Sequence, residues 1–190
     1  PIGTRPVDLH LKGFAAMGAV IEKGHGYVDM SAKKLKGAKI YLDFPSVGAT
    51  ENIIMAAVLA DGETIIENAA AEPEIVDLAD FLNKQGARIS GSGSDTIKIQ
   101  GVKELSPTIH RVIPDRIEAG TFMTAIVATK GKGIIRNIYP AHLTFFTDKL
   151  LKMGANIKLI DPTSMEVSCK NRLNSINYVT QPYPGFPTDL

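Results

Sequence analysis

The chain has 190 residues, of which 44% are hydrophobic and 22% charged, with 21 basic against 20 acidic side chains and a formal net charge of +1. This composition can bury a core, which excludes an intrinsically disordered chain, and it lacks the basic excess that nucleic-acid binding by counterion release requires. The longest apolar run, Ile53 to Ala60, is far shorter than the ~20 residues that span a bilayer, so we expect no membrane insertion. The length suits one large domain or two small ones.

The single cysteine, Cys169, permits no internal disulfide and favours a reducing compartment such as the cytosol. No basic segment followed by an apolar one opens the chain, so no secretory signal is expected. The histidines show no metal-ligand spacing with Cys169, and no dinucleotide-binding glycine pattern is present. We therefore expect neither a metal ion nor a cofactor. Because the chain starts at Pro1 without an initiator Met, we also expect it to be a segment of something longer.

A repeat organises the chain from its first predicted helix. The pattern Gly-Ala-x-Ile recurs with its glycine at positions 18, 86 and 154, two equal steps of 68 residues. Before each glycine, residues spaced i, i+3 and i+7 predict an amphipathic helix that ends at the glycine. These residues are Val7, His10 and Phe14, then Ile75, Leu78 and Leu82, then Leu143, Phe146 and Leu150. After the glycine, two extended segments around a Gly-rich turn, as in 87–99, predict a β-hairpin.

A second helix in each repeat is predicted at 51–60 and again at 118–129, each followed by a Gly turn and a β-branched strand. The run 53–60 is apolar all round, which predicts a helix buried on every side. Each repeat thus supplies two helices and about four strands of an α/β fold. Such a unit cannot stand alone, so about three should close around inner helices with sheets outside, and the chain holds ~2.7 of them.

Polar residues that break the repeat are candidates for a functional site. His10 stands where the other copies have Leu78 and Phe146. A hydrogen-bonded core histidine is the alternative reading. Arg5 and Asp8 flank it at the entrance of a helix, where backbone N–H groups and a guanidinium favour an anion. An ordinary first turn, in which Asp8 compensates the helix dipole, would explain the same residues.

The turns that enter the second helices form the next candidate group. Ser46 and Thr50 are plausible helix caps, and Gly48 would let a ligand approach the backbone, although most turns of this kind are only caps. Asp115 and Asp189 follow prolines in related turns. Each is either a capping acid or a general base that takes a proton from a substrate hydroxyl.

Five segments, 1–10, 43–52, 68–77, 113–121 and 184–189, closely resemble the UDP-N-acetylglucosamine 1-carboxyvinyltransferase family, and the resemblance runs through all 190 residues. It implies an inside-out α/β barrel in two domains of three repeats each. It also implies transfer of the enolpyruvyl group of phosphoenolpyruvate to the 3'-hydroxyl of UDP-N-acetylglucosamine with release of phosphate, the first committed step of peptidoglycan precursor synthesis in the cytoplasm. Residues 1–112 would hold most of the domain on the nucleotide-sugar side, and 113–190 the opening part of the second.

The resemblance also implies roles for individual residues. The UDP-sugar would be bound by Arg5, Pro6, Val7, Asp8, Leu9, Ser46, Val47, Gly48 and Asp189. Asp189 would be the catalytic base for the sugar hydroxyl, and His10, Asp115 and Arg116 are further candidates. Phe44 and Tyr183 depart from the family pattern, because some members carry a basic residue there.

The family's proton-donating loop residue, usually Cys, stands immediately before the segment that opens at Pro1, and Cys169 on its predicted strand does not replace it. We therefore expect the 190 residues alone to be inactive. Two other functions stay open at this point. One is a non-catalytic nucleotide-sugar binding module or paralogue, and the other is the sibling enzyme 3-phosphoshikimate 1-carboxyvinyltransferase.

Overall fold

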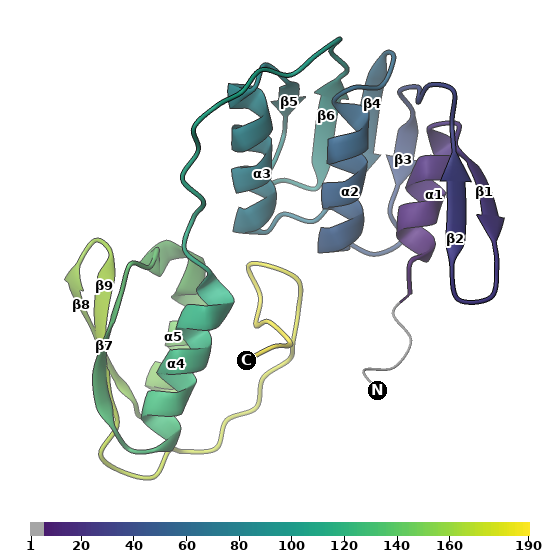
Figure 1. Ribbon diagram of the computed structural model, residues 1–190. Helices are drawn as coiled ribbons and strands as arrows, with labels where there is room; N and C mark the ends of the chain where they lie inside the picture. The colour runs from purple at the N-terminus through teal and green to yellow at the C-terminus, as the bar shows by residue number, and fades with distance from the viewer. Residues whose placement is uncertain (1–5) are drawn as a thin grey trace. The chain divides into compact units, whose positions relative to one another are not determined.

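A computed structural model describes residues 6–190. The chain divides into two compact units, and the boundary in the sequence falls between Arg111 and Val112. Within each unit, helices pack on one face of a β-sheet (Figure 1). The predicted α/β class is confirmed. No helix among residues 6–190 has the length and apolar character needed to cross a membrane.

The first unit contains a two-stranded and a four-stranded sheet. Strand β1 pairs with β2 antiparallel, and the larger sheet has the order β3-β4-β6-β5, in which β3 runs parallel to β4 and the other pairs are antiparallel. Ile40, Ile66 and Ile97 lie side by side across this sheet and are almost fully buried. In chain order the elements are α1 (Asp8–Ala16), β1 (Val20–Lys23), β2 (Val28–Ser31), β3 (Lys39–Tyr41), α2 (Val47–Ala57), β4 (Glu63–Glu67), α3 (Pro73–Lys84), β5 (Arg88–Ser90) and β6 (Thr96–Gln100).

The second unit repeats the order of the last five elements of the first. The series α2, β4, α3, β5, β6 recurs as α4, β7, α5, β8, β9, and the three strands pair antiparallel in the order β7-β9-β8. Met123, Phe146 and Val167 lie in its core. The repeat predicted from the glycine spacing is therefore present in three dimensions. The elements are α4 (Arg116–Ala128), β7 (Lys132–Arg136), a 3-10 helix (Pro140–Leu143), α5 (Thr144–Lys152), β8 (Asn156–Asp161) and β9 (Ser164–Ser168).

The glycines that end the predicted helices adopt the left-handed conformation in all three copies. Their φ angles are 92° at Gly18, 103° at Gly86 and 99° at Gly154. In each copy the N–H of the following alanine donates a hydrogen bond of 3.0 Å to a carbonyl in the last helical turn. The accepting carbonyls are those of Phe14, Leu82 and Leu150. This is the Schellman geometry, which satisfies carbonyls that the helix end would leave unpaired.

We expect Gly86→Ala to lower the free energy of unfolding by about 1–2 kcal/mol, because an L side chain at this φ places its Cβ against the backbone. A Cβ at Gly86 would meet no other atom within 4 Å, so the cost comes from the backbone alone. Denaturant unfolding of both Gly86→Ala and Gly86→Asn measures it. Asn tolerates this conformation better and should cost less; an alanine variant as stable as the parent would contradict the assignment.

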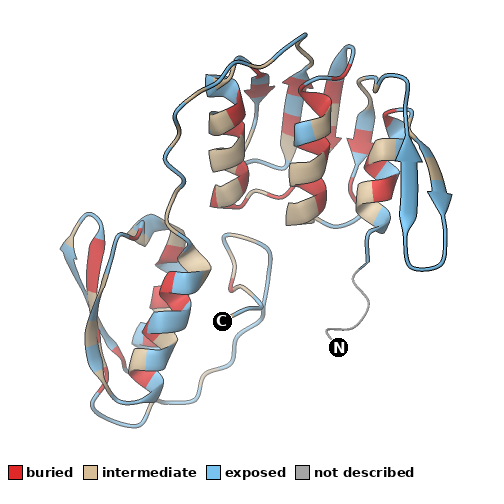
Figure 2. Ribbon diagram, viewed as in Figure 1, coloured by how far each residue is buried: buried red, intermediate tan, exposed pale blue. Residues whose placement is uncertain are grey.

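The second helices are not buried on every side, which differs from the expectation for the run 53–60. Ile53, Ile54 and Ala57 of α2 are fully buried, but Met55 is 47% exposed and Leu59, just after the helix, 49%. Figure 2 shows the same division into a buried and an exposed face along the helices. The sheet lies against one face of α2, and no described element of its unit covers the opposite face.

The predicted stripe on the first helix is also shifted. Val7 is 43% exposed, whereas Leu11 and Gly13 are buried. Gly13 lies against α2, because a Cβ there would come within 2.5 Å of Ile53 Cδ1. The close approach of α1 to α2, rather than the i, i+3, i+7 spacing, decides which face of α1 is buried.

Candidate functional site

Three helices of the first unit begin at the same end of that unit. Helices α2 and α3 start just after the parallel strands β3 and β4, and the first residues of α1 lie at the same end (Figure 1). Helix N-termini present unpaired backbone N–H groups and the positive end of the helix dipole. The start of α2, which has no acidic residue in its first turn, therefore favours a negatively charged ligand, whereas Asp8 and Glu74 already stand in the first turns of α1 and α3.

The turn that enters α2 has a capped start. Ser46 is the N-cap, and its Oγ accepts a hydrogen bond from the N–H of Ala49 at 3.4 Å, so the capping reading of Ser46 holds in the structure. Thr50 is not a cap of this helix. It is fully buried, and its Oγ1 accepts from the N–H of Ala70 at 3.1 Å, which ties the connection between β4 and α3 to α2.

The structure brings His10 of α1 next to the turn that begins α2. Its Nδ1 lies 2.8 Å from the side-chain nitrogen of Asn52. A Cβ at Gly48 would lie 3.3 Å from His10 Cε1, so the missing side chain leaves room for the imidazole ring. Gly48 had suggested space for a ligand; in the described chain that space lies under the His10 ring.

Charged side chains surround this end of the unit. Lys12 pairs with Asp43 at 2.8 Å, and Lys23 lies 3.9 Å from Asp8. Both pairs are exposed and contribute little to stability. Pro6, Val7 and Asp8 are exposed and Leu9 is half-buried, whereas Arg5 lies outside the described residues.

Burial raises the pKa of the half-buried Glu51 carboxyl, and the charges of Glu74 and Glu72 raise it further. A carboxyl whose pKa is raised on folding binds its proton more tightly in the folded state. The folded state therefore loses stability as the pH rises from 4.5, the group's ordinary pKa, through the raised value.

Glu51→Gln should accordingly increase the free energy of unfolding at pH 7. The gain should vanish below about pH 4, where the Glu51 carboxyl is protonated in both the folded and the unfolded protein. Denaturant unfolding at several pH values tests this. Asp80→Asn, which changes an exposed carboxyl on α3, serves as the control. A Glu51→Gln gain that does not depend on pH would show that the charge is not responsible.

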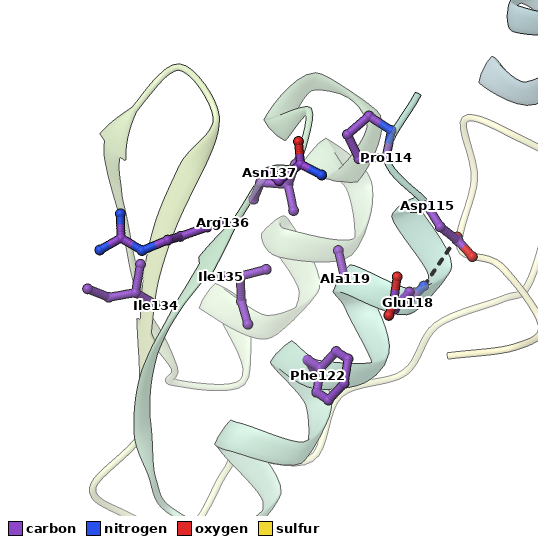
Figure 3. Close-up of a pocket in the computed structure, with 10 residues that line it drawn as sticks. Pro114, Asp115, Glu118, Ala119, Phe122, Ile134, Ile135, Arg136 and Asn137 are labelled. Atoms are coloured by element: carbon purple, nitrogen blue, oxygen red, sulfur yellow. Dashed lines mark hydrogen bonds between the residues drawn. The ribbon is translucent and has the colours of Figure 1, made fainter. Parts of the chain in front are cut away.

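In the second unit, Asp115 caps α4. Its Oδ1 accepts from the N–H groups of Ile117 at 2.7 Å and Glu118 at 3.2 Å. The guanidinium of Arg116 lies 5.2 Å from the centre of the Tyr183 ring, a cation–π contact that sequence reasoning missed. Beside the cap, a cavity of about 390 Å³ opens between α4 and β7, with Asp115, Glu118 and Arg136 among its lining residues (Figure 3).

Replacing Asp115 by Ala should cost about 0.5–2 kcal/mol of stability, because two N–H groups of α4 lose their acceptor. Asp115→Ser keeps a capping oxygen and should restore most of the loss. Thermal unfolding of both variants measures the cap. If Asp115→Ser is as unstable as Asp115→Ala, capping is not the role of this carboxylate.

Asp189 is exposed near the end of the described chain, in a segment held on the second unit by its neighbours. Phe186 is buried, with its ring 5.7 Å from that of Phe146, and the Leu190 side chain occupies the space that a Cβ at Gly120 would need. These contacts on both sides position the Asp189 backbone while its carboxylate remains open to solvent. The structure thus places His10, Ser46, Val47 and Gly48 in the first unit and Asp189 in the second.

This fold, with helices on one face of sheets built from a repeated helix, strand, helix and hairpin, is that of enolpyruvyl transferases. The enolpyruvyl transferase NikO from Streptomyces tendae superposes with a TM-score of 0.83 at 22% identity, over 97% of this chain and 47% of that one. The EPSP synthase from Acinetobacter baumannii has a TM-score of 0.61 at 22% identity, over 94% of this chain and 42% of its own.

The chain belongs to the EPSP synthase (3-phosphoshikimate 1-carboxyvinyltransferase) family, whose profile matches residues 1–190. It is 59% identical over 190 residues to UDP-N-acetylglucosamine 1-carboxyvinyltransferase 2 of Carboxydothermus hydrogenoformans. It is 57% identical over 189 residues to the UDP-N-acetylglucosamine 1-carboxyvinyltransferase of Geobacter metallireducens. All of this chain is covered in both comparisons, and it spans 45% of the length of each relative.

Proposed function

We propose that the protein containing this chain transfers the enolpyruvyl group of phosphoenolpyruvate to the 3'-hydroxyl of UDP-N-acetylglucosamine and releases phosphate. The observation that carries the proposal is the 54–59% identity, over the whole chain, to relatives named for this activity. The sibling reaction on a shikimate phosphate is supported by the family profile, but the structures named for it share only 22% identity with the chain.

In this proposal the first unit binds the nucleotide sugar. The N-terminus of α2, which has no acidic residue in its first turn, favours a diphosphate, because its N–H groups and dipole complement the ligand's charge. The proposed contacts to the nucleotide from the start of α1 are Pro6, Val7, Asp8 and Leu9. Arg5, which lies outside the described residues, is proposed to contact the nucleotide as well. Ser46, Val47 and Gly48 would do so from the start of α2, with His10 between the two helices.

Asp189 is the proposed general base. As the sugar 3'-oxygen forms its bond to C2 of the enolpyruvyl group, the hydroxyl proton passes to the Asp189 carboxylate. At the same time the methylene carbon takes a proton from a general acid of the whole protein and becomes a methyl group, which leaves a tetrahedral C2. The bond between C2 and the phosphate oxygen then breaks, and loss of a proton from the methyl carbon restores the alkene. The exposed carboxylate of Asp189, on a segment fixed by Phe186 and Leu190, supports this role.

We infer that residues 1–112 form most of a nucleotide-sugar domain and 113–190 the opening part of a second domain. The division of the chain after Arg111 supports this boundary. The half-exposed apolar side chains Met55 and Leu59, and Phe122 at 56% exposed, would then be covered by further repeats. The activity belongs to the whole protein, because the chain spans 45% of its relatives, and the lone Cys169 is in keeping with the cytoplasm.

Phosphate release by the full-length protein tests the proposal. We expect release from phosphoenolpyruvate only when UDP-N-acetylglucosamine is added. Parallel reactions contain shikimate 3-phosphate, or no acceptor at all. Equal release with shikimate 3-phosphate, or none with the UDP-sugar, would refute the proposed substrate.

A further inference from the structure

The contact between His10 and Asn52 couples the position of the imidazole proton to the orientation of the Asn52 amide. The side-chain nitrogen of Asn52 lies 2.8 Å from His10 Nδ1, and an amide nitrogen is a hydrogen-bond donor without acceptor capacity. Nδ1 must then accept, which places the ring proton of neutral His10 on Nε2. The reverse orientation of the amide would put its oxygen against Nδ1 and require the opposite tautomer, so the two arrangements differ in a measurable property.

The same contact fixes the direction of the ring. Gly48 and Asn52 are four residues apart on α2 and share one face of the helix, and His10 of α1 lies on that face. A Cβ at Gly48 would be 3.3 Å from Cε1 and 3.6 Å from Nε2, so the Cε1–Nε2 edge of the ring lies over the first turn of α2. Within residues 6–190, His10 Nε2 makes no hydrogen bond.

We propose that Asn52 is a positioning residue that holds His10 as the Nε2–H tautomer, with that N–H directed at an oxygen of the bound nucleotide sugar. The ligand half of this inference rests on the proposed function. In solution, neutral imidazole distributes its proton between both nitrogens, and a neighbouring hydrogen bond selects one of them. Asn52 provides that selection before the ligand arrives, so the donor is already oriented.

The tautomer can be read directly by nuclear magnetic resonance. In the full-length protein labelled with ¹⁵N-histidine, at pH 8, we expect His10 Nε2 to have the shift of a protonated ring nitrogen and Nδ1 that of an unprotonated one. The His10→Gln variant assigns the signals. A proton on Nδ1, or a mixture like that of free histidine, would overturn the proposal.

Asn52 variants give the matched comparison. Asn52→Asp presents only acceptors and should move the proton to Nδ1, and Asn52→Ala should leave a mixture. His110 provides an internal control, because its Nε2 lies 2.9 Å from Asp77 and its Nδ1 3.1 Å from Lys84, away from Asn52. Its signals should not change. If the His10 tautomer stays the same in both variants, Asn52 does not determine it.

Kinetics test separately whether His10 Nε2–H donates to the nucleotide sugar. Asn52→Asp should raise KM for UDP-N-acetylglucosamine about tenfold, the loss of roughly one hydrogen bond, and leave KM for phosphoenolpyruvate unchanged. A reversed tautomer with an unaltered KM would refute the donor role. An inactive parent enzyme would refute the proposed function instead, and the spectra, which need no substrate, would still decide whether Asn52 sets the tautomer.

Discussion

Replacing Asp189 by Asn is expected to lower kcat for phosphate release by about 10²–10⁴-fold, the usual contribution of a general base. The amide has nearly the shape of the carboxylate but cannot take the proton of the sugar hydroxyl. Because the side chain is exposed, the change should leave the folding of the second unit intact. Steady-state phosphate release by the full-length enzyme measures the effect, and circular dichroism confirms that the variant is folded.

Asp80→Asn provides the control for this variant. Asp80 is an exposed carboxylate on α3, so its change removes the same charge without touching the proposed site, and kcat should stay at the parent value. If Asp189→Asn also keeps kcat within threefold of the parent, the proton is taken by another group and the role carried over from the family resemblance is wrong.

Ile53→Ala is expected to lower the free energy of unfolding by about 2–5 kcal/mol, the range found for large-to-small changes in a core. Ile53 is fully buried in α2, and its side chain fills the space left by Gly13 where α1 crosses α2. The cavity would open at the contact between the two helices that hold His10 and Asn52. Denaturant unfolding of the full-length protein, monitored in the first unit, measures the loss.

Ile109→Ala is the matched control for the core variant, because it removes the same atoms from a side chain that is 97% exposed. Its effect should stay within about 0.5 kcal/mol. Equal losses for the two isoleucines would mean that Ile53 does not occupy a packed core position.

Features set by local backbone geometry were predictable from the sequence. Gly18, Gly86 and Gly154 end their helices with positive φ, as predicted. A glycine after an amphipathic stretch indicates a left-handed helix end, a conformation that residues with a side chain avoid. The hairpin of β5 and β6 was likewise signalled by alternation around a Gly-rich turn. Both signals come from residues close together in the chain.

Contacts between distant residues were only half predictable. His10 stood out because it breaks the repeat, but its partner Asn52 is 42 residues away and occupies the place of Thr121 in the next copy, which is also polar. No break in the pattern marks Asn52. The contact between Arg116 and Tyr183 has no local signal either, since it depends on how the last described segment folds back onto α4.

The burial of α2 shows a further limit of pattern reading. A helix that is apolar on every face can be buried on every side, but its sequence does not indicate which element covers each face. In the first unit Ile53 packs against Gly13 of α1 and Ile54 is fully buried, whereas Met55 stays half-exposed. For Asp115 the residue type fitted both a cap and a base, and only the hydrogen bonds to Ile117 and Glu118 reveal the cap.

The most direct test of the proposed reaction is its stoichiometry. Phosphorus nuclear magnetic resonance of the full-length protein with phosphoenolpyruvate and UDP-N-acetylglucosamine should show one inorganic phosphate formed for each phosphoenolpyruvate consumed. Mass spectrometry should show one UDP-sugar gaining an enolpyruvyl group for each phosphate released. Phosphate formed without an enolpyruvyl UDP-sugar, or an unchanged mixture, would contradict the assignment of this chain to an enolpyruvyl transferase acting on UDP-N-acetylglucosamine.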